Sequence, residues 1–271
     1  MAYVTLVTKA DYARGAAALL RSIARTGSAA DRVVLHTPAV PGEMLERLAG
    51  LGARLVETGL LDTSDAFDAA HAKGVLHRAA PFGRGSKPPF HTPLDNFVKL
   101  RVWQLEEYRR VVFVDADALV LQECDRLFAY PEFSAAPNVY ESLADFHRLN
   151  SGVFVADPSA ATFARMMAAL DRPGAFWRRT DQTFLETWFP DWHGLPVFFN
   201  MLQYVWLNMP ELWHWPSIRI LHFQYDKPWQ SAHPRRAALR PLVELWEAHE
   251  AGGPVPDLAT MPPPPQRCAS A

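Results

Sequence analysis

The sequence predicts an α/β fold with a mainly parallel sheet. In the first 60 residues, short apolar runs alternate with segments whose apolar residues recur at helical spacing. Farther along, residues 111–114 are nearly all β-branched and unbroken by polar side chains, which is typical of a central strand buried on both faces. The order strand–helix–strand–helix–strand favours right-handed crossovers, and ligands of such folds bind beyond the carboxyl ends of the strands.

The N-terminal elements follow from these patterns. We expect strands at residues 3–7, 32–36 and 53–57. The first helix between them should end at Gly27. The second should begin at Pro41, placed at the first helical position where its missing N–H costs nothing, and should end at Gly52.

Residues 60–92 lack a clear period and are rich in glycine, proline, serine and histidine. Such a long loop is either a functional segment, such as a lid or a binding loop, or a disordered loop without a specific role. The sequence favours neither interpretation. A helix should follow, with Thr92 as N-cap, Pro93 at the first helical position and Asp95 completing a capping-box-like pair. This helix should run to about Arg110.

The second half of the chain should add two strands and three helices. The strands are expected at residues 151–155 and 219–223, and the helices at residues 159–170, 180–189 and 239–249. Beyond Gly252 the chain is rich in proline, so we expect a domain at residues 1–250 and a flexible, solvated tail at residues 251–271. The aromatic residues at 198–215 could stack on sugar rings, but tryptophan is more often buried, so packing in the core is the favoured interpretation.

The composition excludes several protein classes. The 271 residues carry 27 basic and 29 acidic side chains, a net charge of −2, so there is no global basic field for nucleic acid or an anionic membrane. Cys124 and Cys268 cannot form a disulfide framework, which favours a reducing compartment. Charged residues interrupt the N-terminal segment, and no later run reaches about 18 apolar residues. We therefore expect a soluble, cytoplasmic protein with no membrane span.

The strongest functional signal is Asp115–Ala116–Asp117, directly after the strand at residues 111–114. Alternate side chains of an extended chain point to the same side, so the two carboxylates can converge on one cation. Their oxygens suit Mg²⁺ or Mn²⁺, which keep open positions for water and for the phosphates of a substrate. In the structural alternative, Asp117 caps the following turn and Asp115 accepts backbone hydrogen bonds; both interpretations stay open.

Other polar residues lie at the ends of predicted elements. Lys99 falls on the helix before the acidic pair, and His222 ends the last strand, with Lys227 shortly after it. Asn150–Ser151–Gly152 directly precedes a strand, and Asp181–Gln182 opens a helix, where free N–H groups gather. Each is a weak signal alone, and their shared position at strand and helix ends is what indicates a site.

Several blocks of the sequence, in order, resemble the family 8 glycosyltransferases. The segment TLVTKADYARGA is similar to the family's opening strand, loop and helix, and FVKLRVWQLEEYRRVVFVDADALVL to its helix followed by D-x-D. The segments NSGVFV, DQTFLETWF, FFN and LHFQYDKPW resemble its later blocks. The similarity covers roughly residues 3–229 and leaves out the loop at residues 60–92 and the tail.

This resemblance implies a single GT-A-like, nucleotide-sugar-binding domain with a mixed, mainly parallel sheet flanked by helices. It also implies a metal-dependent, retaining glycosyltransferase that moves a hexosyl group from UDP-glucose or UDP-galactose to a hydroxyl group of a sugar, polyol or glycan acceptor. The implied cofactor is Mn²⁺, with Mg²⁺ as the alternative. Nucleic acid is not an expected partner, and a homodimer is compatible with the sequence.

By motif, the resemblance assigns three sets of residues. The metal ligands would be Asp115, Asp117 and His222, a set compatible with Mn²⁺ and less typical of Mg²⁺. The catalytic residues would be Lys99, Asp181 and Gln182. The donor-binding residues would be Leu6, Thr8, Tyr12, Lys99, Asp115, Ala116, Asp117, Asn150, Gly152, Asp181, Gln182, His222 and Lys227. Tyr12 would offer its ring to the base, and Lys227 its charge to the diphosphate.

The sequence departs from the family pattern at two places. Tyr225 occupies the stretch between His222 and Lys227 where the family block has a glycine, and the spacing is one residue shorter. Bulk therefore lies where the backbone usually approaches phosphate. The position of the tyrosine that self-priming members modify falls on Leu207, with Tyr204 one helical turn away, so we expect the acceptor to be a separate molecule.

Two other functions and two mechanisms stay open. An aspartate-nucleophile phosphatase would use Asp115 as nucleophile and Asp117 as acid/base, but the late aspartate pair of that class is absent from the sequence. A non-catalytic UDP-sugar-binding module would keep the same fold. For retention, Asp181 could bond covalently to the sugar, or departure and attack could occur on the same face, which we favour.

Overall fold

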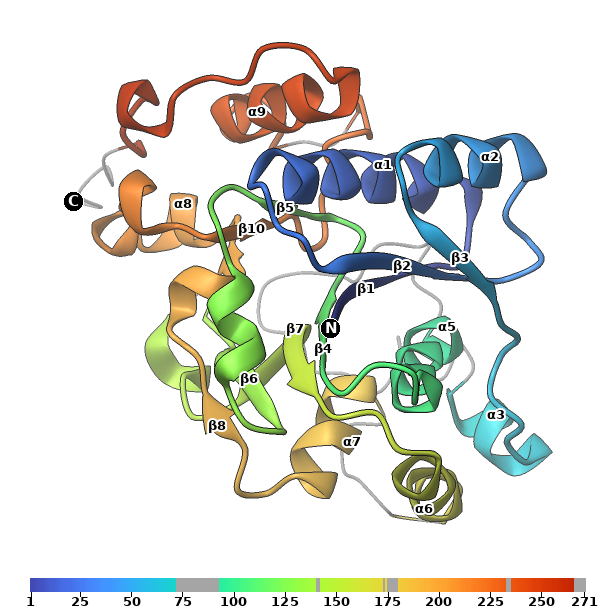
Figure 1. Cartoon of the computed structure of the whole chain (residues 1–271). Coiled ribbons are helices and arrows are strands. Elements are labelled where there is room, and N and C mark those ends of the chain that lie inside the picture. Colours follow the sequence, from blue (N-terminus) through green and yellow to red (C-terminus); the bar gives the residue numbers. More distant parts are fainter. Residues whose placement is uncertain (72–92, 140–141, 173, 175–179, 233–234, 266–271) are drawn as a thin grey trace.

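The computed structural model describes residues 1–71, 93–139, 142–172, 174, 180–232 and 235–265. Within these residues the strands form two sheets (Figure 1). In order, the seven strands of the larger sheet are β3 (Arg54–Glu57), β2 (Asp31–His36), β1 (Ala2–Val7), β4 (Val111–Val114), β7 (Leu149–Ala156), β6 (Ser134–Pro137) and β8 (His193–Gly194). The three strands of the smaller sheet are β5 (Ala118–Val120), β10 (Ile220–His222) and β9 (Met201–Leu202).

The predicted start of the chain is confirmed. β1 pairs in parallel with β2 and β4, and β2 with β3, while α1 (Ala10–Arg25) and α2 (Gly42–Gly50) connect the strands. Gly27 and Gly52 follow the two helices with φ of 77° and 79°, the left-handed region that ends a helix. Pro41 differs from the prediction: its ψ of 141° lies outside the helical region, so it precedes α2 as the N-cap. Its carbonyl accepts hydrogen bonds from the N–H groups of Met44 and Leu45.

Antiparallel pairing completes the large sheet on the far side of β4. β7 is antiparallel to β4 and β6, and β8 runs parallel to β6, which makes the sheet mixed and mainly parallel, as predicted. β7 begins at Leu149, so Asn150, Ser151 and Gly152 lie within a strand and not before one. The sequence does not predict β5, β6, β8 or β9, which have two to four residues each and are not set off as separate apolar runs between turn signals.

The chain passes from one sheet to the other through the acidic turn. β4 ends at Val114 in the large sheet, and β5 begins at Ala118 in the small one. β5 runs antiparallel to β10 and pairs Ala118 with His222. The turn at residues 115–117 therefore lies beside the end of β10.

Helices cover both faces of the large sheet (Figure 1). α1 and α2 lie on one face, and α9 (Arg240–Ala251) packs against α1. The other face carries α3 (Asp65–His71), α5 (Pro93–Phe97), α6 (Ala160–Leu170) and α7 (Asp181–Trp188). The helices predicted at residues 159–170, 180–189 and 239–249 are thus confirmed, and the side chains of Ser159 and Thr180 cap α6 and α7. Among the described residues, no helix is both long and apolar enough to cross a bilayer.

Shorter helical segments connect these elements. They are α8 (Val205–Asn208) and the 3₁₀ helices η1 (Val98–Gln104), η2 (Asp125–Ala129), η3 (Leu143–Asp145), η4 (Val197–Asn200), η5 (Pro210–Leu212), η6 (Trp215–Ser217) and η7 (Leu258–Thr260).

The helix expected at residues 92–110 is shorter and less regular than predicted. Thr92 lies outside the described residues, and α5 passes into η1, where β-branched valines disfavour a regular α-helix. The chain then turns, and the hydroxyl of Tyr108 donates to Asp31 Oδ2 at 2.9 Å. Residues 105–110 therefore lead back to the sheet instead of extending the helix.

The segment at residues 60–92 contains a helix that the sequence does not predict. α3 buries Phe67 and His71, four residues apart, and both rings contact the ring of Phe97. The expectation of no regular structure is wrong here because two rings on one helical face suffice to anchor a short helix. Residues 72–92 lie outside the described part of the chain.

The aromatic segment near the C-terminus packs the core, as favoured from the sequence. The rings of Trp206, Trp213 and Trp215 are 2 %, 7 % and 6 % exposed and contact one another. The cluster is extended by apolar residues beyond α9, namely Val255, Leu258 and Met261. The indole N–H of Trp215 also donates to the carbonyl of Pro262 at 2.8 Å. This part of the expected tail therefore packs a few apolar side chains against the core while most of its residues stay exposed, and residues 266–271 lie outside the described part.

We predict that His249 makes the fold sensitive to acid. The residue is 3 % exposed in α9, and burial, aided by Arg25, lowers the pKa of its imidazole to about 4. The unfolded chain takes up this proton near pH 6.5, so the free energy of unfolding should fall by up to about 3 kcal/mol as the pH drops from about 6.5 to about 4. Urea unfolding of the native chain and of His249→Gln across this range tests this. Equal pH dependence in both would contradict it.

Candidate active site

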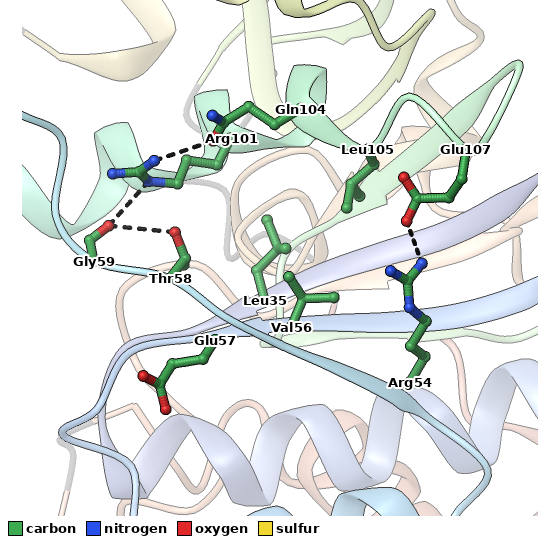
Figure 2. A pocket seen from close by; sticks show the side chains of 10 residues that line it. All are labelled: Leu35, Arg54, Val56, Glu57, Thr58, Gly59, Arg101, Gln104, Leu105 and Glu107. Atoms are coloured by element: carbon green, nitrogen blue, oxygen red, sulfur yellow. Dashed lines mark hydrogen bonds and ion pairs between the residues drawn. The ribbon is translucent and has the colours of Figure 1, made fainter.

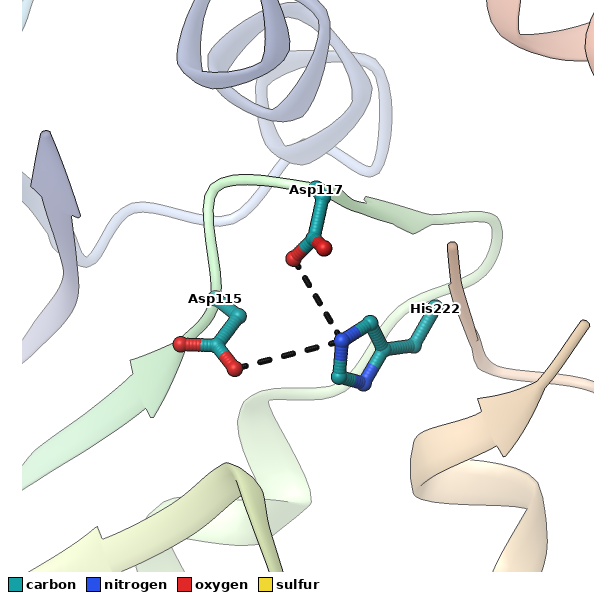
Figure 3. Close-up of side chains that lie close together, drawn as sticks. All are labelled: Asp115, Asp117 and His222. Carbon is teal, nitrogen blue, oxygen red and sulfur yellow. Dashed lines mark ion pairs between the residues drawn. The ribbon is translucent and has the colours of Figure 1, made fainter. Parts of the chain in front are cut away.

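The acidic turn and the end of β10 bring three side chains together (Figure 3). Asp115 directly follows β4, Asp117 ends the turn, and His222 is the last residue of β10. One ligand atom of each lies within 4.8 Å of those of the other two. The backbone holds this turn, because the N–H of Asp115 donates to the carbonyl of Gly152 and the N–H of Phe223 to the carbonyl of Asp117, both at 2.8 Å.

The imidazole of His222 faces both carboxylates (Figure 3). Its Nε2 lies 3.3 Å from Asp117 Oδ1 and 3.9 Å from Asp115 Oδ2. The side chains of His222 and Asp117 are each 6 % exposed, whereas that of Asp115 is 28 % exposed. The group is therefore largely desolvated and reaches solvent on the side of Asp115.

Two buried lysines balance the acidic groups. Lys227 Nζ forms an ion pair with Asp117 and donates to the carbonyl of Phe223 at 3.0 Å. Lys99 Nζ lies 3.3 Å from Asp115 Oδ1 and 3.0 Å from Asp181 Oδ2. With His222 neutral, the three aspartates and two lysines leave the cluster one negative charge in excess.

The neighbours determine how each charge titrates. Burial alone would raise the pKa of Asp117, but Lys227 and His222 outweigh it and hold that pKa well below its usual range. Burial alone would lower the pKa of Lys99 and of Lys227, but the adjacent carboxylates raise both. Burial raises the pKa of Asp115, which Lys99 opposes and Asp117 reinforces. Asp115 is thus the carboxylate that a further cation would stabilise most.

Asp181 opens α7 and is held by residues from two other elements. Its Oδ2 accepts a hydrogen bond from Ser151 Oγ at 2.7 Å and is paired with Lys99. Lys99 also donates to the carbonyl of Ser151 at 3.3 Å. Gln182 follows as the second, half-buried residue of α7. The structure thus makes Lys99 a bridge between Asp115 and Asp181.

Three asparagines from separate segments form a row that ends at His222. Asn200 Oδ1 lies 2.9 Å from His222 Nδ1, and Asn200 Nδ2 donates to Asn150 Oδ1 at 2.8 Å. Asn150 Oδ1 also accepts from the N–H of Gly152 at 2.9 Å, and Asn150 Nδ2 donates to Asn138 Oδ1 at 3.1 Å. The resemblance assigns Asn150 to donor binding, but in the structure its side chain bonds to Asn138, Gly152 and Asn200.

The predicted residues of the base pocket lie at the carboxyl end of β1. Leu6 is in β1, Thr8 follows it, and Tyr12 is in the first turn of α1. Lys227 Nζ lies 5.8 Å from the centre of the Tyr12 ring, so Tyr12 is joined to the acidic cluster through this lysine. Leu6 and Thr8 lie at the end of β1, whose neighbour β4 leads into the acidic turn.

Close packing of α1 supports the acidic turn from behind. A Cβ placed on Gly15 would lie 2.4 Å from the carbonyl oxygen of Ala116 and 2.8 Å from the ring of Trp229. Ala116, assigned to the donor by the resemblance, is 3 % exposed. Only glycine lets the helix approach this turn so closely.

Tyr225 adopts a left-handed backbone conformation. Its φ is 63°, in the left-handed region that favours glycine. The ring packs edge-on against Tyr204 at 5.9 Å between centres. Lys227, two residues later, still reaches Asp117, so the shorter segment keeps this lysine at the site.

A separate pocket of about 420 Å³ lies between β3 and η1 (Figure 2). It is lined by Leu35, Arg54, Val56, Glu57, Thr58, Gly59, Arg101, Gln104, Leu105 and Glu107. Three of its charged groups are engaged within the protein: Arg54 pairs with Glu107, and Arg101 donates to the carbonyl of Gly59 at 3.1 Å. None of the predicted site residues lines this pocket.

Sequence reasoning missed three residues that position the site. Ser151 holds Lys99 and Asp181, Asn200 holds His222, and Gly15 admits the acidic turn. Asn200 carries a recognisable signal, because it is a single amide inside the apolar run VFFNML and is fully buried. Ser151 carries only the weak signal of Asn150–Ser151–Gly152 and Gly15 carries none, because the partners of both come from distant segments.

The model of glycosyl transferase family 8 matches residues 3–233 of the chain. The chain belongs to this family. Human glycogenin-1 is 32 % identical over 238 residues, which cover 84 % of this chain and 62 % of glycogenin-1. The UDP-glucuronate:xylan alpha-glucuronosyltransferase 2 of Arabidopsis thaliana is 29 % identical over 238 residues, which cover 84 % of this chain and 35 % of that protein. This family 8 chain therefore spans only part of the length of these relatives.

Solved structures of other glycosyltransferases share the fold. The galactosyltransferase LgtC, solved with donor and acceptor sugar analogues, superposes with a TM-score of 0.61 at 13 % identity, covering 95 % of this chain and 98 % of LgtC. GlyE of Streptococcus pneumoniae TIGR4 gives a TM-score of 0.62 at 17 % identity, covering 95 % and 62 %. The fold of this family 8 chain is thus of the GT-A type, as predicted.

Proposed function

We propose that this chain transfers a hexosyl group from a UDP-sugar to a hydroxyl group of a separate acceptor, with retention of configuration and with Mn²⁺ in preference to Mg²⁺. The observation that carries the proposal is the convergence of Asp115, Asp117 and His222 at the carboxyl end of a central strand, in a chain of family 8. Family membership favours sugar transfer over phosphatase chemistry at the same aspartate pair.

The three side chains fit a divalent cation. Two carboxylates and one imidazole suit Mn²⁺, and the cluster carries one excess negative charge. His222 Nε2 points at two carboxylate oxygens, which is repulsive unless a cation or a proton lies between them. When bound there, the ion would neutralise charge that develops on the departing diphosphate.

The other residues would orient the donor and stabilise charge on the sugar. Lys227 lies between Asp117 and the ring of Tyr12, a position from which its ammonium can meet the diphosphate while Tyr12 meets the base. Asp181 offers a fixed carboxylate to the oxocarbenium-like sugar. Because Asp181 Oδ2 already pairs with Lys99 and Ser151, we favour departure and attack on the same face over a covalent bond to Asp181. For Leu6, Thr8, Asn150, Gly152 and Gln182 we propose the donor-binding role that the family resemblance implies.

Turnover of a panel of UDP-sugars tests the proposal. The panel contains UDP-glucose, UDP-galactose and, because the name of a relative includes it, UDP-glucuronate. Release of UDP with transfer or hydrolysis of the sugar, dependent on added Mn²⁺, supports the proposed function. Release of phosphate from a monoester would instead support the phosphatase, and donor binding without turnover would support a binding module.

A separate acceptor predicts that the chain does not modify itself. Tyr204 is 5 % exposed, its hydroxyl donates to Asp226, and the aligned position is Leu207, which has no hydroxyl. Incubation with Mn²⁺ and each UDP-sugar, without acceptor, should leave the intact mass of the protein unchanged. An increase by one or more hexosyl units would contradict this prediction.

A further inference from the structure

We propose that Asn150 and Asn200 are positioning residues that fix the tautomer of His222 and so prepare its Nε2 for the cation. The proposal deepens the proposed function and rests on it only in taking a cation as the ligand of this cluster. Asn200 bonds to the imidazole directly, whereas Asn150 acts on it through Asn200.

The orientation of the two amides follows from one unambiguous donor. The backbone N–H of Gly152 can only donate, so the Asn150 atom 2.9 Å away is its oxygen. The Asn200 atom that lies 2.8 Å from this oxygen must then be its NH₂ group, because two oxygens at this distance would repel. The remaining atom of the Asn200 amide, its oxygen, faces His222.

The imidazole tautomer follows in turn. Asn200 Oδ1 can only accept, so His222 Nδ1, 2.9 Å away, carries a hydrogen. In a neutral imidazole this leaves a lone pair on Nε2, the atom directed at Asp115 and Asp117. A metal ligand needs this lone pair, and the hydrogen bond made by the other ring nitrogen decides which nitrogen offers it.

The surroundings of the ring also fix its rotation. A Cβ on Gly152 would lie 2.4 Å from His222 Cε1 and 2.6 Å from Nδ1, so the strand backbone is packed directly against the ring. His222 is 5 % exposed and Asn200 is fully buried. The hydrogen bond between Asn200 and His222 is therefore shielded from bulk solvent.

Metal affinity and tautomer can be measured without sugar transfer. We expect Asn200→Ala and Asn150→Ala each to weaken binding of Mn²⁺, measured by electron paramagnetic resonance of the free ion, by about 10- to 100-fold. Asn150→Asp should retain affinity within about threefold or tighten it, because its carboxylate still accepts from Gly152 and Asn200, and Asn138 can turn its NH₂ group toward the new oxygen.

Asn138→Ala is the matched control. Asn138 lies at the far end of the same row, where its side-chain oxygen accepts from the NH₂ group of Asn150, so loss of this side chain leaves the orientation of Asn200 unchanged. We expect Mn²⁺ affinity within about twofold of the native chain. Thermal unfolding of every variant shows whether a lost affinity reflects a lost fold.

The tautomer itself is read from ¹⁵N shifts of labelled histidine, with His222 assigned by its disappearance in His222→Gln. At about pH 8, Nδ1 of His222 should show the shift of a protonated nitrogen in the metal-free and Mg²⁺-loaded native chain and in Asn150→Asp. An unprotonated Nδ1 in the native chain, or native Mn²⁺ affinity in folded Asn200→Ala, would overturn the proposal. Turnover of UDP-sugars by the native chain is measured separately. If the native chain turns over donor but either of these results is found, the tautomer proposal fails while the proposed function stands.

Discussion

Replacement of Asp117 by asparagine should lower cation-dependent sugar transfer by about 100- to 1,000-fold. The variant keeps the shape of the side chain and removes one of the two carboxylates that face His222 Nε2. The fold should remain, because the asparagine oxygen can still accept a hydrogen bond from Lys227 and the backbone bond from Phe223 does not involve the side chain. Initial rates with saturating UDP-sugar and titrated Mn²⁺, together with circular dichroism, measure both effects.

Asp157→Asn is the matched control for this prediction. Asp157 is also an ion-paired carboxylate, bound by Arg110 at 2.5 Å, but it lies at the other end of β4, beyond β7. Its variant should turn over donor at the native rate. If Asp117→Asn also transfers sugar at the native rate with the same Mn²⁺ dependence, the assignment of the metal site is wrong.

Gly15→Ala should damage the site without touching a ligand of the metal. The added methyl group would lie 2.4 Å from the carbonyl oxygen of Ala116, a backbone atom between the two aspartates. Relief of this overlap must displace the acidic turn or α1, so we expect a loss of stability of about 1–3 kcal/mol. A shift of the carboxylates of about 1 Å would lower transfer by about 100-fold. Urea unfolding and initial rates test the two effects.

Gly50→Ala is the matched control for Gly15→Ala: the same substitution should here increase stability and leave activity unchanged. Gly50 ends α2, and a Cβ placed on it meets nothing within 4 Å. Alanine is the better helix former, so this variant should gain about 0.5–1 kcal/mol and keep native activity. If Gly15→Ala were equally stabilising and fully active, close approach of α1 to the acidic turn would not be required.

The parts of the fold that the sequence predicted are those with local patterns. The strands at residues 3–7, 32–36 and 111–114 are short apolar runs, and helix α6 has apolar residues that recur at helical spacing. The short strands β8 and β9 have two residues each and exist only because distant segments pair with them. Such strands depend on the tertiary structure and leave no periodic trace in the sequence.

The irregular helix after residue 92 shows a second limit. The sequence predicts the start of this helix from local residues. Its end depends on the hydrogen bond of Tyr108 to Asp31, which lies 77 residues earlier in the chain. In the same way, the packing of residues beyond Gly252 depends on Trp215, whose indole N–H donates a hydrogen bond to the carbonyl of Pro262. Proline-rich composition alone indicates a solvated segment, because it says nothing of a partner elsewhere.

At the candidate site, the sequence predicts which side chains are suited to a ligand. It does not predict their hydrogen-bond and ion-pair partners within the protein. Asp115, Asp117 and His222 were grouped by motif and do converge. Lys99 and Asn150 were assigned to the donor, but in the structure their polar groups contact Asp115, Asp181 and the neighbouring amides. A motif identifies which groups are chemically suited to a ligand, whereas the hydrogen bonds among them depend on the packing of several strands.

The passage of the chain between its two sheets has a mechanical consequence. Asp115 extends from β4 of the large sheet, and His222 ends β10 of the small sheet, so the candidate ligands come from both sheets. A cation bound by these ligands would therefore link the two sheets at this point. A displacement of one sheet relative to the other would change the distances between the ligands. The affinity for the cation would therefore depend on how the two sheets pack together.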